Sequence, residues 1–226
     1  MVESTPTTAG SETVDRAAIK NELLAQAEEI LSKWDTYAVQ LNDPARNIVS
    51  KTFPAGDGLV GVINKYVAKK MTMKHVEELA DNMEHHMHTM NPAQTMTRLP
   101  DQQGEKCYAV NVKTPAIMSN RAYISMIYQV RKEDGTVIHL QTTKGCDSLR
   151  QEFADKLDKK AVICDIPLAY STYKTEADGL HITMIATFKM NGRVPNFFMN
   201  FAMKSNTTAP IMIEDYIVDG KIPKMM

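Results

Sequence analysis

The sequence lacks the segments that would place a protein in or on a membrane by itself. A membrane helix needs roughly 18 consecutive apolar residues, and no run of that kind occurs in the 226 residues. The first fifteen residues are polar and acidic, so no secretory signal is predicted. No Gly follows Met1, and the C-terminal KIPKMM carries no Cys for prenylation. We therefore expect a soluble protein of the reducing cytoplasm.

The chain also lacks an excess of either charge. It has 26 basic and 27 acidic residues, a formal net charge of -1. Proteins that bind nucleic acid need a basic surface to neutralise phosphates. No nucleic-acid partner is predicted.

Cysteine is scarce, and the common catalytic motifs are missing. The chain has three cysteines, Cys107, Cys146 and Cys164. Their odd number and the lack of a CxxC pair argue against a disulfide framework or a zinc knuckle. The sequence has no GxSxG, GxGxxG or P-loop motif. We predict no catalytic residue, no cofactor and no enzymatic activity. For each cysteine a buried structural role is favoured. A nucleophile activated by a neighbouring His stays open as an alternative.

Apolar residues are plentiful, at 43% of the chain, and 16 of them are Met. Met is flexible and adapts to irregular apolar shapes. The Met content therefore fits either a plastic ligand cavity or ordinary filling of a core, and the second interpretation is favoured.

Apolar periodicity predicts an α+β protein. Residues 1–11 resemble a disordered tail, and residues 12–226 form one domain without a linker. Helices are expected over 12–31, capped by Ser11, and over 72–90, capped by Thr72. Strands are expected over 34–41, 47–53, 59–68, 108–112, 122–132, 137–143, 161–173 and 180–189, with hairpin turns at Asp134-Gly135 and Asp178-Gly179.

The C-terminal third predicts a container with a lid. Residues 180–189 alternate between apolar and polar, as in an antiparallel sheet with one face toward solvent. An apolar helical segment follows within 192–217 and must cover the apolar face of the sheet.

Two motifs resemble the START domain, the steroidogenic acute regulatory protein-related lipid-transfer family. Residues 192–200, GRVPNFFMN, match the family's Gly, aliphatic residue, Pro, aromatic and Asn at the start of its terminal helix, and Pro210 lies where many members have a Pro. In Ser119-Asn120-Arg121-Ala122-Tyr123 the family's Arg is kept and its Asp is lost. A second cavity-facing Arg of many members is Ile127 here, which weakens the analogy with sterol carriers. The resemblance covers about 12–222.

The resemblance implies a helix-grip fold, in which a curved antiparallel sheet wraps around a long C-terminal helix, with an N-terminal helix added. It also implies a non-enzymatic protein that binds one lipid or other hydrophobic ligand and carries or senses it between membranes. Transient contact with a membrane surface would open the terminal helix, with Gly192 as a possible hinge. The alternatives are an enzyme of the wider superfamily with a small hydrophobic substrate, or an interaction protein with a collapsed cavity. The candidate ligand-binding residues are Tyr108, Val110, Val112, Arg121, Ile182, Met184, Ala186, Phe198, Met199 and Ala202.

A histidine-rich run is the main competing feature. Residues 83–90, MEHHMHTM, hold three His and three Met, which could bind copper or zinc. The run lacks the HExxH and ExxH patterns of known metal sites. A solvated helix end is the favoured interpretation, and no metal site is predicted.

Overall fold

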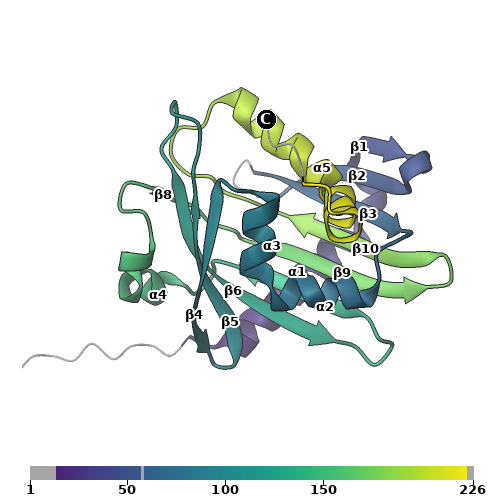
Figure 1. Ribbon diagram of the computed structural model, residues 1–226, viewed down its shortest axis with the longest axis horizontal. Helices are drawn as coiled ribbons and strands as arrows, with labels where there is room; N and C mark the ends of the chain where they lie inside the picture. Colours follow the sequence, from purple (N-terminus) through teal and green to yellow (C-terminus); the bar gives the residue numbers. More distant parts are fainter. Residues whose placement is uncertain (1–13, 57–58, 223–226) are drawn as a thin grey trace, which may run out of the picture.

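The fold is built on one curved sheet of ten strands (Figure 1). The computed structural model describes residues 14–56 and 59–222, so the predicted tail lies outside the described residues. The strands are β1 (Ala38–Asp43), β2 (Ile48–Pro54), β3 (Val60–Ala68), β4 (Gln94–Gln102), β5 (Glu105–Val112), β6 (Arg121–Arg131), β7 (Val137–Thr142), β8 (Val162–Ile163), β9 (Ala169–Glu176) and β10 (Gly179–Ala186). Nine of them form the antiparallel order β1-β2-β3-β10-β9-β7-β6-β5-β4, and β8 pairs in parallel with β6.

Helices cover both faces of this sheet. They are α1 (Arg16–Ser32), α2 (Met73–Asp81), α3 (Met83–Met90), α4 (Asp147–Glu152) and α5 (Asn196–Asp219). Figure 1 shows α2, α3 and α5 on one face and α1 on the other. The prediction of an α+β helix-grip fold with an N-terminal and a long C-terminal helix is confirmed. None of the helices described is both long and apolar enough to span a membrane.

The two sides of β10 are as predicted, but its second side faces water only in part. Ile182, Met184 and Ala186 lie on the α5 side, opposite Tyr66, Asn64 and Val62 of β3. On the other side His181 is partly exposed, whereas α1 packs its apolar stripe against the sheet and Ile185 is only 1% exposed. The prediction of a solvent-facing side was therefore wrong for the part that α1 covers, because period-2 alternation does not show what a distant helix covers. The stripe of α1 consists of Ile19, Leu23, Ala27 and Ile30.

The first helix starts later than predicted, and the second one is interrupted. The cap of α1 is Asp15, whose carboxylate accepts from the backbone N–H of Ala18 at 2.9 Å, in place of the predicted Ser11. The predicted helix over 72–90 divides at Asn82 into α2 and α3. At its start Thr72 donates its backbone N–H to Nδ1 of His75 at 3.0 Å, as a capping residue does.

Two predicted strands are shorter than expected. Residues 34–36 form a 3-10 turn before β1, so the strand predicted over 34–41 begins only at Ala38. The strand predicted over 161–173 is divided into β8 and β9, with Pro167 in the gap. Proline has no N–H for a sheet ladder, which accounts for the interruption.

All three cysteines are buried and unpaired. Cys107 and Cys146 belong to the core beneath α1, and Cys164 packs with Tyr108 and Tyr123 on the other side of the sheet. Burial raises the pKa of the Cys107 thiol to about 12 and that of Cys164 to about 11, and it also raises the pKa of Cys146. They are thiols, not thiolates, at neutral pH.

Candidate functional site

The space between the sheet and its covering helices is not filled. One hollow of about 240 Å³, which we call the inner cavity, lies beneath α2, α3 and the second half of α5. A second hollow of about 320 Å³, the lid cavity, lies beneath the first half of α5. The inner cavity is lined by Leu79, Met83, His86, Met87, Met90, Gln94, Met96, Tyr123, Ile127, His139, Leu140, Gln141, Ala169, Ser171, Tyr173 and Ile213. The lid cavity is lined by Val60, Val62, Tyr123, Ile166, Ala169, Ala186, Thr187, Phe188, Met190, Met199, Ala202, Met203, Ser205 and Asn206.

The two cavities adjoin each other. Tyr123 of β6 and Ala169 of β9 line both, so together they form the boundary. No Asp, Glu, Lys or Arg is present among the described residues that line either cavity. An apolar chamber with a few neutral polar groups is the usual character of a site for a small hydrophobic molecule.

The lid cavity adjoins a further hollow between α5 and strands β1 to β3, which we call the groove. The groove shares Val60, Phe188, Met199 and Met203 with the cavity. It also reaches Lys204, which is exposed. Val60 is 52% exposed although it is a large apolar side chain. The chamber therefore approaches solvent along the first half of α5.

The predicted ligand-binding residues fall into three groups. Ala186, Met199 and Ala202 line the lid cavity. Tyr108, Val110 and Val112 belong to or pack against the apolar cluster that contains Met96, Tyr123 and Ile127, and Ile182 and Met184 belong to or pack against the cluster beneath the second half of α5. The side chain of Phe198 lies outside the described part of the structure.

Arg121, the predicted polar anchor, is 1% exposed and holds the loop before α5. Its guanidinium donates to the carbonyl oxygens of Met190 at 2.8 Å and Asn191 at 3.1 Å, and also to that of Ser119. Gly192 follows with a φ of +63°, a left-handed conformation that favours glycine. In this structure the guanidinium is occupied by backbone carbonyls.

Two histidines give the inner cavity its polar character. His86 of α3 is 7% exposed, and its Nδ1 lies 2.8 Å from the hydroxyl of Tyr216 of α5. His139 of β7 packs its ring edge-on against Tyr173, with 5.4 Å between ring centroids. The Nε2 atoms of both histidines are buried and have no hydrogen-bond partner among the described residues.

Burial keeps both rings neutral at physiological pH. It lowers the pKa of His139 to about 4, and the charges of Lys106 and Arg131 act in the same direction. Burial also lowers the pKa of His86, with a further contribution from His85 and an opposing one from Glu78. A neutral imidazole has one N–H donor and one acceptor nitrogen.

The middle of α5 is held by side chains of the sheet. Pro210 has no N–H, so it cannot donate to the carbonyl of Asn206 one turn earlier. Nδ2 of Asn64 donates to that carbonyl at 2.8 Å, and Oγ of Ser50 donates to the carbonyl of Thr207 at 2.7 Å. Between the two halves of α5, hydrogen bonds from side chains of the sheet thus replace part of the backbone hydrogen bonding within the helix.

The second half of α5 is fixed by a buried carboxylate. Glu214, 8% exposed, accepts hydrogen bonds from the backbone N–H groups of Lys70 at 2.7 Å and Met71 at 2.9 Å. It also accepts from the hydroxyl of Tyr66, whose pKa is raised, first by burial and then by this hydrogen bond. The groove lies beside the first half of α5. The second half is held by hydrogen bonds to β3, to the chain that follows it and to α3.

Solved structures share this arrangement of sheet and helices. No protein-family model and no curated protein sequence matches the chain. Human StAR-related lipid transfer protein 5 superposes with a TM-score of 0.69 at 10% identity, over 91% of this chain and 99% of that one. Human STARD10 gives 0.66 at 10% identity, over 92% and 81%. A STAR-related lipid transfer protein from Xanthomonas axonopodis gives 0.60 at 17% identity, over 81% and 97%. The chain has a START-type fold.

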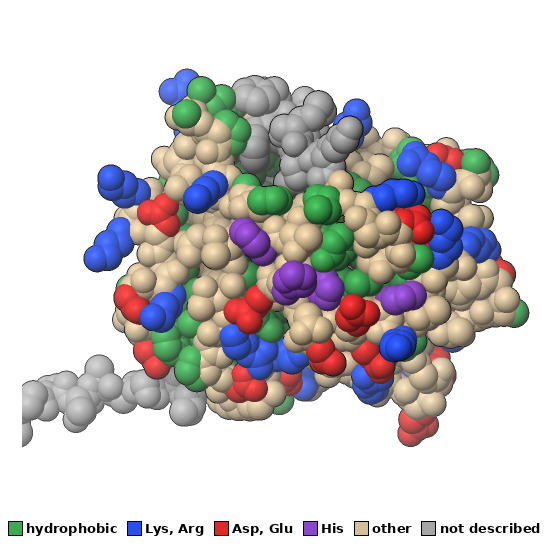
Figure 2. Space-filling view, in the orientation of Figure 1, with side chains coloured by type: hydrophobic (Ala, Val, Ile, Leu, Met, Phe, Trp, Pro, Cys, Tyr) green, Lys and Arg blue, Asp and Glu red, His purple; other side chains and the backbone are tan. Residues whose placement is uncertain are grey.

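Within the START-type fold, the histidine-rich run is part of the cavity wall and does not form a metal cluster. His86 points to Tyr216, and Nδ1 of His88 lies 3.1 Å from the carbonyl of Gln94, while His85 is exposed. Met83 and Met87 line the inner cavity. Figure 2 shows that histidine side chains gather on the face that carries α2 and α3.

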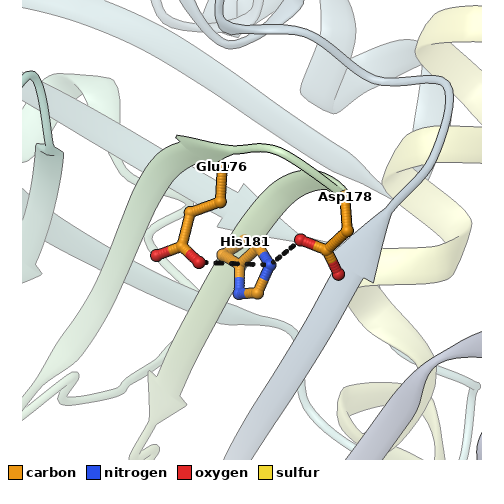
Figure 3. Close-up of side chains that lie close together, drawn as sticks. All are labelled: Glu176, Asp178 and His181. Atoms are coloured by element: carbon orange, nitrogen blue, oxygen red, sulfur yellow. Dashed lines mark hydrogen bonds and ion pairs between the residues drawn. The ribbon is translucent and has the colours of Figure 1, made fainter.

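A second group of ligand-type side chains lies on the β9–β10 hairpin, outside the chamber (Figure 3). Nε2 of His181 lies 2.6 Å from Oδ1 of Asp178 and 3.7 Å from Oε2 of Glu176. The hydrogen bond to His181 holds the pKa of Asp178 below its usual range. Both carboxylates are exposed, and the group is a surface ion-pair cluster.

None of the ligand-binding residues predicted from the sequence is among the described residues that line the inner cavity of this START-type fold. His139 lies in a strand that was predicted correctly, but its face was not assigned. His86 was noted only as one member of a histidine run. The alternation of β7 could have identified His139, because Val137, His139 and Gln141 share one side of that strand.

Proposed function

We propose that the protein binds one lipid or other hydrophobic molecule in its internal chamber and carries or senses it between membranes, without catalysis. The observation that carries this proposal is the pair of adjoining apolar cavities, whose described lining has no charged side chain. The START-type fold supports it, since the similar structures include proteins described as lipid transfer proteins. Of the ligand-binding residues predicted from the sequence, Ala186, Met199 and Ala202 line this chamber, and we propose these three as its ligand contacts.

Entry would occur along the first half of α5. Residues 192–205, which we call the lid segment, lie between the loop held by Arg121 and the helix turn held by Asn64 and Ser50. The groove beside the lid segment leads from the lid cavity to the surface. A movement confined to this segment would open the chamber while the rest of α5 stays in place.

Membrane contact would occur at the same end of the molecule. Val60 is exposed beside the lid cavity, and Ile117, 67% exposed, lies in a surface hollow with Arg193 and Pro195 at the start of the lid segment. Exposed apolar side chains next to a basic residue suit an anionic lipid surface. Replacing both Val60 and Ile117 with Asp is expected to weaken binding to anionic liposomes in a flotation assay.

The direct test is native mass spectrometry of the protein purified from cells, followed by lipid extraction and by uptake from liposomes. We expect one ligand per chain. Met199→Asp places a charge in the lid cavity and should reduce uptake at least tenfold. Lys74→Asp, at an exposed position of α2 that lines neither cavity nor the groove, should leave the uptake unchanged. Failure of the wild-type protein to retain or take up any lipid would contradict the proposal.

An enzyme acting on a small hydrophobic substrate is the second candidate, and the buried pair His86 and His139 favours it. Cavity groups with displaced pKa values are frequent at active sites. A base with a pKa near 4, however, is a weak proton acceptor at neutral pH. Recovery of a chemically altered ligand after incubation would support the enzyme, and recovery of the unaltered ligand would support the carrier.

A further inference from the structure

The wall of the inner cavity includes two histidines, His86 and His139. In each of them Nε2 is buried and has no hydrogen-bond partner among the described residues. A buried polar atom without a hydrogen bond costs about 1–3 kcal/mol. Such atoms need an explanation, and their position in the chamber wall suggests that a ligand satisfies them.

One neighbouring polar group in this cavity is already engaged, because Nε2 of Gln141 donates to Oγ of Ser125 at 2.9 Å. His86 uses its Nδ1 for the hydroxyl of Tyr216, so Nε2 is its remaining nitrogen. The two Nε2 atoms are therefore ring nitrogens that a ligand would satisfy by forming a hydrogen bond.

The chemistry of these atoms selects the ligand group. The described lining of the inner cavity has no cation, and Lys106, which shares an adjoining hollow with His139, has Glu105 beside it there. A carboxylate or a phosphate in the inner cavity would therefore be buried without a counter-charge in its wall, at a high cost in free energy. A neutral imidazole offers either a donor or an acceptor at Nε2, according to its tautomer. A hydroxyl both donates and accepts, so it fits either tautomer at either ring, whereas an ether oxygen or a carbonyl only accepts.

We propose that His86 and His139 form the polar end of the site and bind the hydroxyl of an uncharged lipid alcohol. The inference rests on the proposed function. The hydroxyl lies in the inner cavity, and the apolar part of the molecule extends past Tyr123 and Ala169 into the lid cavity. The apolar part is an alkyl chain or a ring system, and the test distinguishes the two.

The test compares matched ligands that differ only at the polar group. Liposomes are loaded with 1-hexadecanol, its methyl ether or palmitic acid, and a second series contains cholesterol or its methyl ether. Native mass spectrometry measures uptake at pH 7.4. At least one of the two alcohols should be taken up about tenfold more than its own methyl ether, because the ether cannot donate a hydrogen bond. It should also be taken up about tenfold more than palmitic acid, because the acid is charged. The series with the larger preference identifies a chain or a ring system.

Variants locate the preference within the molecule. His139→Phe and His86→Phe, each checked for folding by circular dichroism, should reduce the alcohol-to-ether ratio toward one while the uptake of the ether remains. His181→Phe is the matched control, since His181 lies on the other side of β10 and lines neither cavity, and it should keep the full ratio.

The outcomes separate the two proposals. If wild-type protein takes up the ether or the acid as well as the alcohol, or if the histidine variants keep the preference, lipid binding stands and the assignment of His86 and His139 is wrong. If no member of either series is taken up, this inference fails, and the proposed function is then decided separately by extraction of lipid from the protein purified from cells.

Discussion

Glu214 holds the second half of α5 through the hydrogen bonds that its side-chain oxygens accept. Its partners are two backbone N–H groups and the hydroxyl of Tyr66. Glu214→Ala would leave these donors buried and unpaired, so we expect the free energy of unfolding to fall by about 3 kcal/mol. Urea unfolding measures this change. Asp215→Ala removes a half-exposed neighbour, 3.7 Å from Lys221, and should cost below about 0.5 kcal/mol.

His139 makes stability depend on pH in a defined window. The pKa of an unperturbed His is 6.5, and that of His139 in the folded protein is about 4. Between these values the unfolded chain binds a proton that the folded chain does not. The contribution of neutral His139 to the free energy of unfolding is therefore complete above pH 6.5 and is lost as the pH falls toward 4. We expect about 2 kcal/mol to be lost between pH 7 and pH 4.5 on this account.

The measurement compares the free energy of unfolding of the wild type and His139→Phe at several pH values across that window. The variant has no titrating group at this position, so its stability should decline less. His86, whose pKa is also lowered, remains in both proteins and adds a slope of the same sign to each. Equal slopes in the two proteins would show that His139 is protonated as easily as in the unfolded chain.

At the scale of an element, α5 tolerates a proline because the sheet supplies the missing donor. Asn64→Leu should cost about 1–2 kcal/mol, since the carbonyl of Asn206 loses its partner. In a Pro210→Ala background the helix regains its own N–H donor, so the same substitution should cost less. The double-mutant cycle is expected to give a coupling energy of about 1 kcal/mol, measured by urea unfolding. Additive costs would show that Asn64 contributes only through packing.

At the scale of the whole molecule, the boundary between the two cavities sets the length of the ligand. Ala169 lines both, so Ala169→Phe would fill the junction without adding a polar group. We expect this variant to retain shorter ligands than the wild type does. Native mass spectrometry measures the masses of the bound lipids and so tests this expectation. Ala186→Phe narrows the lid cavity alone and serves as the comparison. An unchanged length distribution would place the ligand in one cavity only.

The sequence was sufficient for most of the elements and for the START-type fold, because most strands and helices carry their own periodicity and the segment over 192–200 has its own motif. It did not predict the strand β4 or the division between α2 and α3. It could not show that α1 covers the outer side of the sheet, since α1 meets strands from many parts of the chain there, β10 among them. It also could not show the paired histidines. His86 and His139 come from a helix and a strand, and only the folded, curved sheet brings them to one cavity.

The burial of Cys107, Cys146 and Cys164 has a practical consequence for observing the lid segment. Their raised pKa values make all three natural thiols poor nucleophiles at neutral pH. A cysteine introduced at the exposed Lys204 would therefore react selectively with a maleimide dye while the native cysteines stay in place. The fluorescence of that single label would report, in real time, when the helix beside the groove moves and how fast it returns.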